Sequence, residues 1–307
     1  MSESKMSKPP SATTPPKSWK HYELFESVKK AIFSLPSRFE SSLNIDGVLA
    51  TDLFAFNSSL AATIEQQVVD ALNKLRSVWD PEQKYALYDF ERQPQTFPDV
   101  VLKASAPGVD PKVIMGIELK GWYVLAKEKE PSFRYKVTPA VCAPADLLVV
   151  VPWALSNVIS GSPIVFAPFV MSARHAAEYR NWYWQHKRKG SSDKGIELSS
   201  VDQNYPTKSE MISDRPASDG GGNFGRLARA GVMEEYITEL FEEKLAGIQL
   251  SAWQRFLSIF TEGVTDKDID AALQKIANNI AITVGDPEAS QKLAEKFREM
   301  ASLIEGE

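Results

Sequence analysis

Three residues in the first half of the chain carry side chains that could act together on a phosphodiester bond. Asp99 follows Pro98 at the start of one apolar run, and Glu118 and Lys120 lie two residues apart inside a longer apolar run, "VIMGIELKGWYVL". Successive side chains of a strand point to opposite faces, so the glutamate and the lysine share one face. Phosphodiester cleavage needs carboxylates that hold a divalent cation and a positive side chain that orients, or helps to deprotonate, the attacking water. We therefore take Asp99, Glu118 and Lys120 as candidate catalytic residues, with Asp99 and Glu118 as candidate Mg²⁺ ligands.

This arrangement resembles the signature of the PD-(D/E)XK nuclease superfamily, the fold of most type II restriction endonucleases. Pro98-Asp99 matches its PD and Glu118-Leu119-Lys120 its ExK, and the spacing of 118 − 99 = 19 residues fits the hairpin of that family. The resemblance covers roughly residues 58 to 155. It implies a restriction-endonuclease-like fold, Mg²⁺ as cofactor and products that carry 5'-phosphates. It also implies a glutamate on the preceding helix, for which Glu65 is the candidate by topology.

The elements that must position these residues are predicted to form a mixed central β-sheet flanked by helices, an α/β fold. Short runs typical of strands occur in "YALYDF", "DVVL", "VIMGIELKGWYVL" and "DLLVVVPWAL", separated by Pro, Gly and charged residues. "LLVVV" is continuously apolar, as expected for a central strand covered on both faces. A helix precedes the strands, with an apolar stripe at helical spacing that comprises Leu60, Ile64, Val68, Ala71, Leu72 and Leu75.

Three regions follow from these patterns. Residues 1–17 are rich in Pro, Ser and Thr and are predicted to be a disordered tail. Residues 18–230 are interpreted as a nuclease core with DNA-contacting insertions, including a long irregular stretch after residue 190. Residues 231–307 show the periodicity of an α-helical C-terminal region, with a start signal at Thr265, and are expected to serve dimerisation or target recognition.

Two basic segments are candidates for DNA contact. The first, "ARHAAEYRNWYWQHKRKG", combines aromatic rings with cations; the second, "SDGGGNFGRLARAG", places arginines after a glycine-rich loop. Cations can bind phosphates, and arginine can read guanine through two hydrogen bonds. The alternatives are an aromatic helix face that packs in the core, a solvated helix end, and a flexible glycine-rich linker. The candidate DNA-binding residues are Arg174, Arg180, Lys187, Arg188, Lys189, Arg226 and Arg229.

Composition excludes several other classes of function. The net charge of −5 argues against a protein that coats nucleic acid non-specifically. A single cysteine and three histidines cannot form a zinc site of recognisable spacing, which leaves oxygen ligands and hence a hard cation such as Mg²⁺. The glycine-rich loop lacks the lysine of a nucleotide-binding P-loop. No secretory leader or membrane-spanning run is evident, so we expect a cytoplasmic protein.

The sequence therefore predicts a Mg²⁺-dependent endonuclease of double-stranded DNA, a type II restriction enzyme that acts as a homodimer on a short site. One alternative is a non-catalytic DNA-binding or scaffold protein with a nuclease-like fold, in which Glu118 and Lys120 are a structural surface pair. Another is a repair or junction nuclease. Cutting into discrete fragments, binding without cutting, and preference for branched DNA would distinguish the three.

Overall fold

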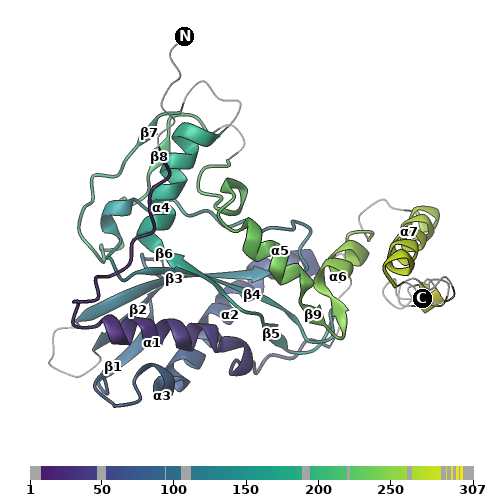
Figure 1. Cartoon of the computed structure of the whole chain (residues 1–307), viewed down its shortest axis with the longest axis horizontal. Coiled ribbons are helices and arrows are strands. Elements are labelled where there is room, and N and C mark those ends of the chain that lie inside the picture. Colours follow the sequence, from purple (N-terminus) through teal and green to yellow (C-terminus); the bar gives the residue numbers. More distant parts are fainter. Residues whose placement is uncertain are drawn as a thin grey trace, which may run out of the picture.

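A mixed six-stranded sheet forms the centre of the molecule (Figure 1). The computed structural model describes residues 8–46, 53–93, 95–104, 112–188, 194–219, 222–260 and 265–284, with single positions between 288 and 299. The strands of this sheet are β1 (Tyr88–Arg92), β2 (Val100–Ala104), β3 (Val113–Tyr123), β4 (Leu147–Leu155), β5 (Pro163–Val165) and β6 (Phe169–Ser172). The four strands predicted from the sequence are thus confirmed.

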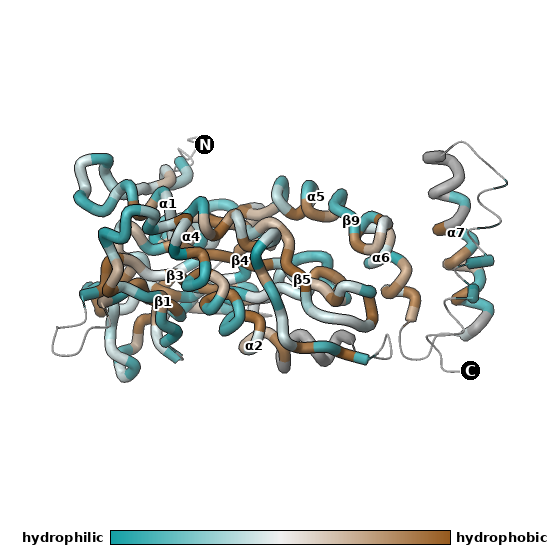
Figure 2. Tube along the Cα trace, turned by 90° about the horizontal axis from the view of Figure 1, so that it is seen from below, coloured by the Kyte–Doolittle hydropathy of each residue, from teal (hydrophilic) through white to brown (hydrophobic). Residues whose placement is uncertain are grey.

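The sheet combines one parallel pair with antiparallel neighbours. β3 and β4 are parallel, with Glu118 opposite Leu148, whereas β1, β2 and β3 form an antiparallel series. On its other edge β4 pairs with β6 along its first half and with β5 at its end, both antiparallel. Every residue of β4 is buried, as predicted for a central strand, and the hydropathy colouring of Figure 2 shows hydrophobic residues along it.

Helices cover the sheet on both faces. The main helices are α1 (Tyr22–Phe33), α2 (Leu53–Lys74), α3 (Arg76–Trp79) and α4 (Ala173–Trp182), the last extended by a π-helical turn (Tyr183–Lys187). α1 buries residues at positions 24, 25, 28, 31 and 32, the spacing of one helix face. The predicted stripe of α2 is likewise buried from Ile64 onward and joins α1 and the sheet in the main core. A smaller core beneath α4 contains Leu148, Tyr135 and Cys142.

The C-terminal helices share the main hydrophobic core with the sheet. The C-terminal part comprises α5 (Glu234–Glu242), the hairpin β9 (Lys244–Leu245) and β10 (Ile248–Gln249), α6 (Leu250–Leu257) and α7 (Asp266–Val284). Trp253, Phe256 and Leu257 of α6 belong to the same buried cluster as the sheet. The start signal at Thr265 is confirmed, because its hydroxyl donates to Asp268 Oδ2 over 2.6 Å. The hairpin was not predicted; its turn, Ala246-Gly247, has φ of 49° and 83°.

The prediction of a disordered tail does not hold for residues 8–17. This segment runs past α4 before α1 begins (Figure 1), and Pro15 within it is buried. The hydroxyls of Thr13 and Ser172 lie 3.5 Å apart, which places the segment beside the end of β6. Residues 1–7 lie outside the described part. A two-stranded sheet of β7 (Ile196–Glu197) and β8 (Arg215–Pro216) organises the irregular stretch that follows α4.

Candidate active site

The hairpin of β2 and β3 brings the two halves of the PD…ExK motif together. Val100, the first residue of β2, pairs with Ile117 of β3. Asp99, the residue just before β2, therefore lies beside Glu118 of β3, as the sequence predicted. Residues 105–111, which connect the two strands, lie outside the described residues.

A close contact between Pro98 and Gly116 holds the start of β2 against β3. A Cβ atom placed on Gly116 would lie only 2.2 Å from Pro98 Cγ, so no other residue fits there without a shift of the proline. The buried Asp146 fixes the same point from the other side, since its Oδ1 accepts a 2.7 Å hydrogen bond from the Gly116 amide. This contact between Gly116 and Pro98 thus fixes the backbone position of Asp99, the next residue.

Lys120 joins the two carboxylates. Its Nζ lies 2.8 Å from Asp99 Oδ2 and 2.8 Å from Glu118 Oε1. Asp99 Oδ2 also accepts a hydrogen bond of 3.1 Å from the Leu119 amide. Burial alone would lower the pKa of Lys120, but Glu118 and Asp99 together raise it above its ordinary value, so the ammonium stays charged. Asp99, Glu118 and Lys120 therefore lie together; as candidates for catalysis, these three residues are called the catalytic trio below.

Glu118 is the most enclosed member of the catalytic trio. The residue is 8% exposed, and its Oε2 is buried without a hydrogen-bond partner among the described residues. Burial raises the pKa of Glu118 to about 7; Lys120 opposes the rise and Asp99 adds to it. A buried carboxylate oxygen without a partner costs free energy. A cation bound at Oε2 would remove that cost.

Glu65, the candidate placed by topology, lies close to the catalytic trio. α2 packs closely against β3, as Gly121 shows: a Cβ atom added to this residue would lie 3.8 Å from Cα of Ala61. Burial raises the pKa of Glu65, and the charge of Asp99 raises it further. Its Oε2 lies 3.3 Å from Nη2 of Arg92 on β1. Sequence reasoning missed Arg92, because nothing in "YDFER" connects it to a helix 27 residues earlier.

The carboxylates present are few for a metal site. Among the described residues, no group of three or more His, Cys, Asp or Glu side chains is arranged to hold a metal ion. Mg²⁺ often takes only one or two protein carboxylates and keeps several waters. Asp99 and Glu118 match that requirement in type and number.

Comparisons with known proteins identify no relative of this chain. A scan against family models, a search of curated proteins and a search of solved structures find no match. The resemblance to PD-(D/E)XK nucleases stays a prediction that rests on the motif and on the geometry just described. Among the described residues, no helix is long and apolar enough to cross a lipid bilayer.

The first basic segment divides into buried and exposed cations. Arg180, predicted to contact DNA, is 3% exposed. Its Nη2 lies 2.5 Å from Asp214 Oδ2, and its Nη1 donates to the carbonyls of Tyr135 and Val137 over 2.9 Å. The prediction for Arg180 therefore needs correction, because every direction of its guanidinium is used inside the fold. Arg174 donates to the Cys142 carbonyl and is half-buried.

The end of this segment is more accessible, since Lys187 is exposed and Arg188 is partly exposed. Lys187 Nζ lies 5.9 Å from the ring centre of Trp182, and the guanidinium of Arg188 lies 3.5 Å from that of Trp184. Trp184 is buried against Phe224, whereas the aromatic residues interpreted as a core face, Tyr179, Trp182 and Tyr183, are half-buried. Lys189 lies outside the described residues.

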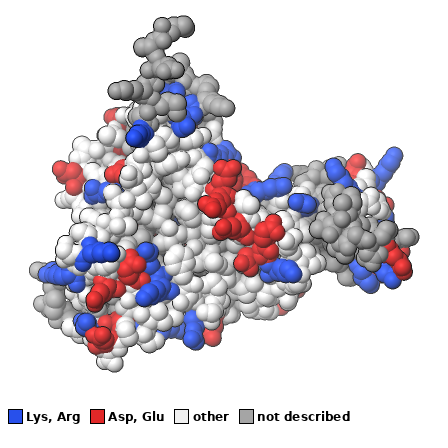
Figure 3. Space-filling model, viewed as in Figure 1, with Lys and Arg blue, Asp and Glu red and all other residues white. Residues whose placement is uncertain are grey.

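The second basic segment is paired with acidic side chains. Arg226 Nη1 lies 3.4 Å from Glu128 Oε2, and Arg229 Nε lies 2.8 Å from Glu130 Oε1. Figure 3 shows acidic side chains gathered in this part of the surface, over α5. A DNA phosphate or base would have to displace the two glutamates. The local charge therefore favours this segment less than the end of α4 as a DNA contact.

Proposed function

We propose that this chain is a Mg²⁺-dependent endonuclease of double-stranded DNA, of the type II restriction kind. The observation that carries the proposal is the catalytic trio: two carboxylates from neighbouring strands meet one lysine ammonium at 2.8 Å each, and Glu118 Oε2 is buried without a partner among the described residues. A structural ion pair between strands would not need a third charge or an unsatisfied oxygen.

The carboxylates and the lysine of the catalytic trio have different roles in this proposal. Asp99 and Glu118 would hold the Mg²⁺ ion, which supplies a Lewis acid for a non-bridging phosphate oxygen. Lys120, charged through its contacts with both carboxylates, would orient the attacking water and offset negative charge that develops at the phosphorus. Glu65, held by Arg92, would add negative charge beside Asp99.

DNA would be engaged chiefly through the end of α4. We propose that Lys187 and Arg188 contact phosphates, since aromatic rings hold both side chains and the described residues provide no carboxylate within ion-pairing distance of either. We propose a cytoplasmic homodimer that acts on a short palindromic site; the dimer and the palindrome are what the resemblance implies. The oligomeric state can be measured by light scattering of the intact protein.

The test is digestion of long duplex DNA with Mg²⁺ and with EDTA. We expect discrete fragments from the wild type only when Mg²⁺ is present. Asp99→Asn and Glu118→Gln should each abolish cutting, because both keep shape but remove a charge that holds a hard cation.

Glu91→Gln is the matched control, since Glu91 also pairs with a lysine across neighbouring strands, Lys103 at 2.8 Å. It should cut like the wild type. Cutting by Asp99→Asn and Glu118→Gln at the wild-type rate would refute the paired-carboxylate site. Binding without cutting by the wild type would favour a scaffold protein, and a preference for branched DNA would favour a junction nuclease.

A further inference from the structure

The start of β3 lines a cavity whose walls include no member of the catalytic trio. This cavity of about 490 Å³ opens between the N-terminal segment, the start of β3 and two later loops. This volume is within the range of about 300–1,000 Å³ that is typical of small-molecule sites. The lining residues are Pro15, Pro16, Trp19, Lys20, His21, Lys112, Val113, Ile114, Ala143, Pro144, Ala145, Asn204 and Tyr205.

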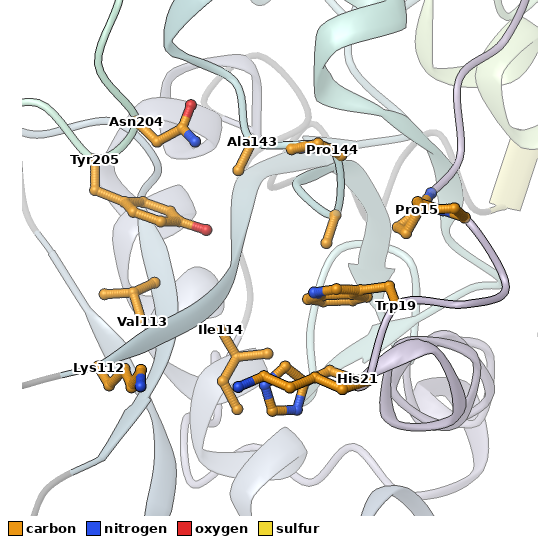
Figure 4. Close-up of a pocket in the computed structure, with 13 residues that line it drawn as sticks. Pro15, Trp19, His21, Lys112, Val113, Ile114, Ala143, Pro144, Asn204 and Tyr205 are labelled. Carbon is orange, nitrogen blue, oxygen red and sulfur yellow. The ribbon is translucent and has the colours of Figure 1, made fainter.

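Flat and apolar side chains form most of the wall. In Figure 4 Trp19 and Tyr205 lie on opposite sides of the cavity, with Pro144 along its upper edge. The Trp19 ring meets the edge of His21 at 5.3 Å and 77°, so the histidine supports it from one side. His21 is held in turn, because its Nδ1 lies 2.8 Å from the Tyr85 hydroxyl. The Tyr205 hydroxyl donates to the buried Asp146, which fixes that ring as well.

The charged groups of the wall are all basic. Lys20 and Lys112 are exposed. Burial lowers the pKa of His21, and the charges of Lys20 and Lys112 lower it further. In the described part of the chain neither lysine has an ion-pair partner within 4.0 Å, and none of the lining residues is acidic. An apolar slot with rigid rings and unpaired cations at its edge is complementary to an aromatic anion.

We propose that this cavity binds a nucleotide. The base would stack in the slot between Trp19 and the Pro144 side, and the phosphate would contact Lys20 and Lys112. The ligand could be a free mononucleotide or an unpaired nucleotide of a DNA strand, since both present the same chemistry. The inference is independent of cleavage, because none of the lining residues belongs to the catalytic trio.

The experiment is calorimetric titration in EDTA with deoxyadenosine monophosphate, deoxyadenosine and inorganic phosphate. We expect deoxyadenosine monophosphate to bind more tightly than either fragment. Trp19→Leu should weaken this binding about tenfold, the order of one lost base-stacking contact. Lys20→Gln and Lys112→Gln should each weaken it about fivefold and flatten its dependence on salt, because each removes a contact with the phosphate.

Two matched controls test whether the effects belong to the cavity. Phe33→Leu removes an exposed aromatic ring at the end of α1, and Lys30→Gln removes an exposed lysine of the same helix; neither residue lines the cavity. Both should bind like the wild type. Should Trp19→Leu fail to fold, which thermal melting would show, the two exposed lysine variants carry the test alone.

A further comparison separates the two sources of the nucleotide. A duplex with one extrahelical adenine is titrated against its fully paired counterpart, again without metal. Tighter binding of the bulged duplex than of the paired one, lost in Trp19→Leu, would assign the site to an unpaired nucleotide of DNA. Equal binding of the two duplexes would assign it to a free mononucleotide. The proposal is overturned if inorganic phosphate or deoxyadenosine binds as tightly as deoxyadenosine monophosphate. It is also overturned if Trp19→Leu, shown to be folded, or both lysine variants leave the affinity for every nucleotide probe unchanged.

Discussion

The variant Glu118→Gln measures how much the ionised carboxylate of Glu118 lowers the free energy of unfolding. Burial raises the pKa of Glu118 from its ordinary value of 4.5 to about 7 in the folded protein. In the unfolded chain the carboxyl ionises near the ordinary value, so between pH 4.5 and 7 the folded state keeps a proton that the unfolded state has released. The free energy of unfolding must therefore fall as the pH rises through this window, and glutamine at position 118 removes that part of the fall.

The size of the effect follows from the two pKa values. Each tenfold change in proton affinity corresponds to about 1.4 kcal/mol, so the ionised Glu118 costs roughly 3 kcal/mol at pH 8. Domains are commonly stable by only about 5–15 kcal/mol, so a loss of this size is measurable. Glu65 and Asp146 also have raised pKa values, but they titrate in the wild type and in the variant alike. Their contribution cancels in the difference.

The assay is urea denaturation in EDTA at pH 5, 6, 7 and 8. The gap in unfolding free energy between Glu118→Gln and the wild type should widen in favour of the variant as the pH rises. Glu91→Gln should follow the wild type, because its carboxylate is half-exposed at 39%. Parallel stability curves for the wild type and Glu118→Gln would refute the claim that Glu118 is buried with a raised pKa.

Three further outcomes follow from contacts described above. Lys120→Ala should abolish Mg²⁺-dependent cutting while DNA affinity, measured by gel shift, stays within about tenfold, because a group that acts mainly in the transition state adds little to binding; normal turnover would exclude the lysine. Gly116→Ala should lower the free energy of unfolding by about 1–3 kcal/mol, because the new methyl overlaps the Pro98 ring; an unchanged urea midpoint would show that the proline can yield. Asp214→Asn should cost about 3–5 kcal/mol by leaving the buried Arg180 without its counter-charge, and a thermal melt equal to that of the wild type would contradict this.

The sheet and the catalytic trio could be predicted because their signals are local. Continuous apolar runs mark β3 and β4, and the i, i+2 spacing of Glu118 and Lys120 places both on one face whatever the rest of the chain does. The proline before Asp99 marked the start of its strand. These features need only the residues of one hairpin and the strand that follows it.

The missed features depend on contacts between distant segments. Arg180 lies on the same helix face as the buried Ala173 and Ala177, but its charge suggested a surface position. Only the carboxylate of Asp214, which lies in an irregular stretch 34 residues later, makes its burial possible. The ion pair between Arg92 on β1 and Glu65 on α2 likewise joins segments 27 residues apart, so no local pattern predicts it. The two-residue strands β9 and β10 are too short for alternation to be seen. The low hydropathy of residues 8–17 suggested disorder, although prolines can pack on a surface without any regular structure.

The path of the N-terminal segment has a consequence for the preparation of the protein. Because residues 1–17 are rich in Pro, Ser and Thr, they could be taken for a tail and deleted from an expressed protein. Pro15, however, is buried and lines the cavity together with Pro16. A chain that starts at residue 18 would lose one wall of that cavity and the contact between Thr13 and Ser172. An affinity tag therefore belongs at the N-terminus of the intact chain, so that Thr13, Pro15 and Pro16 keep their contacts.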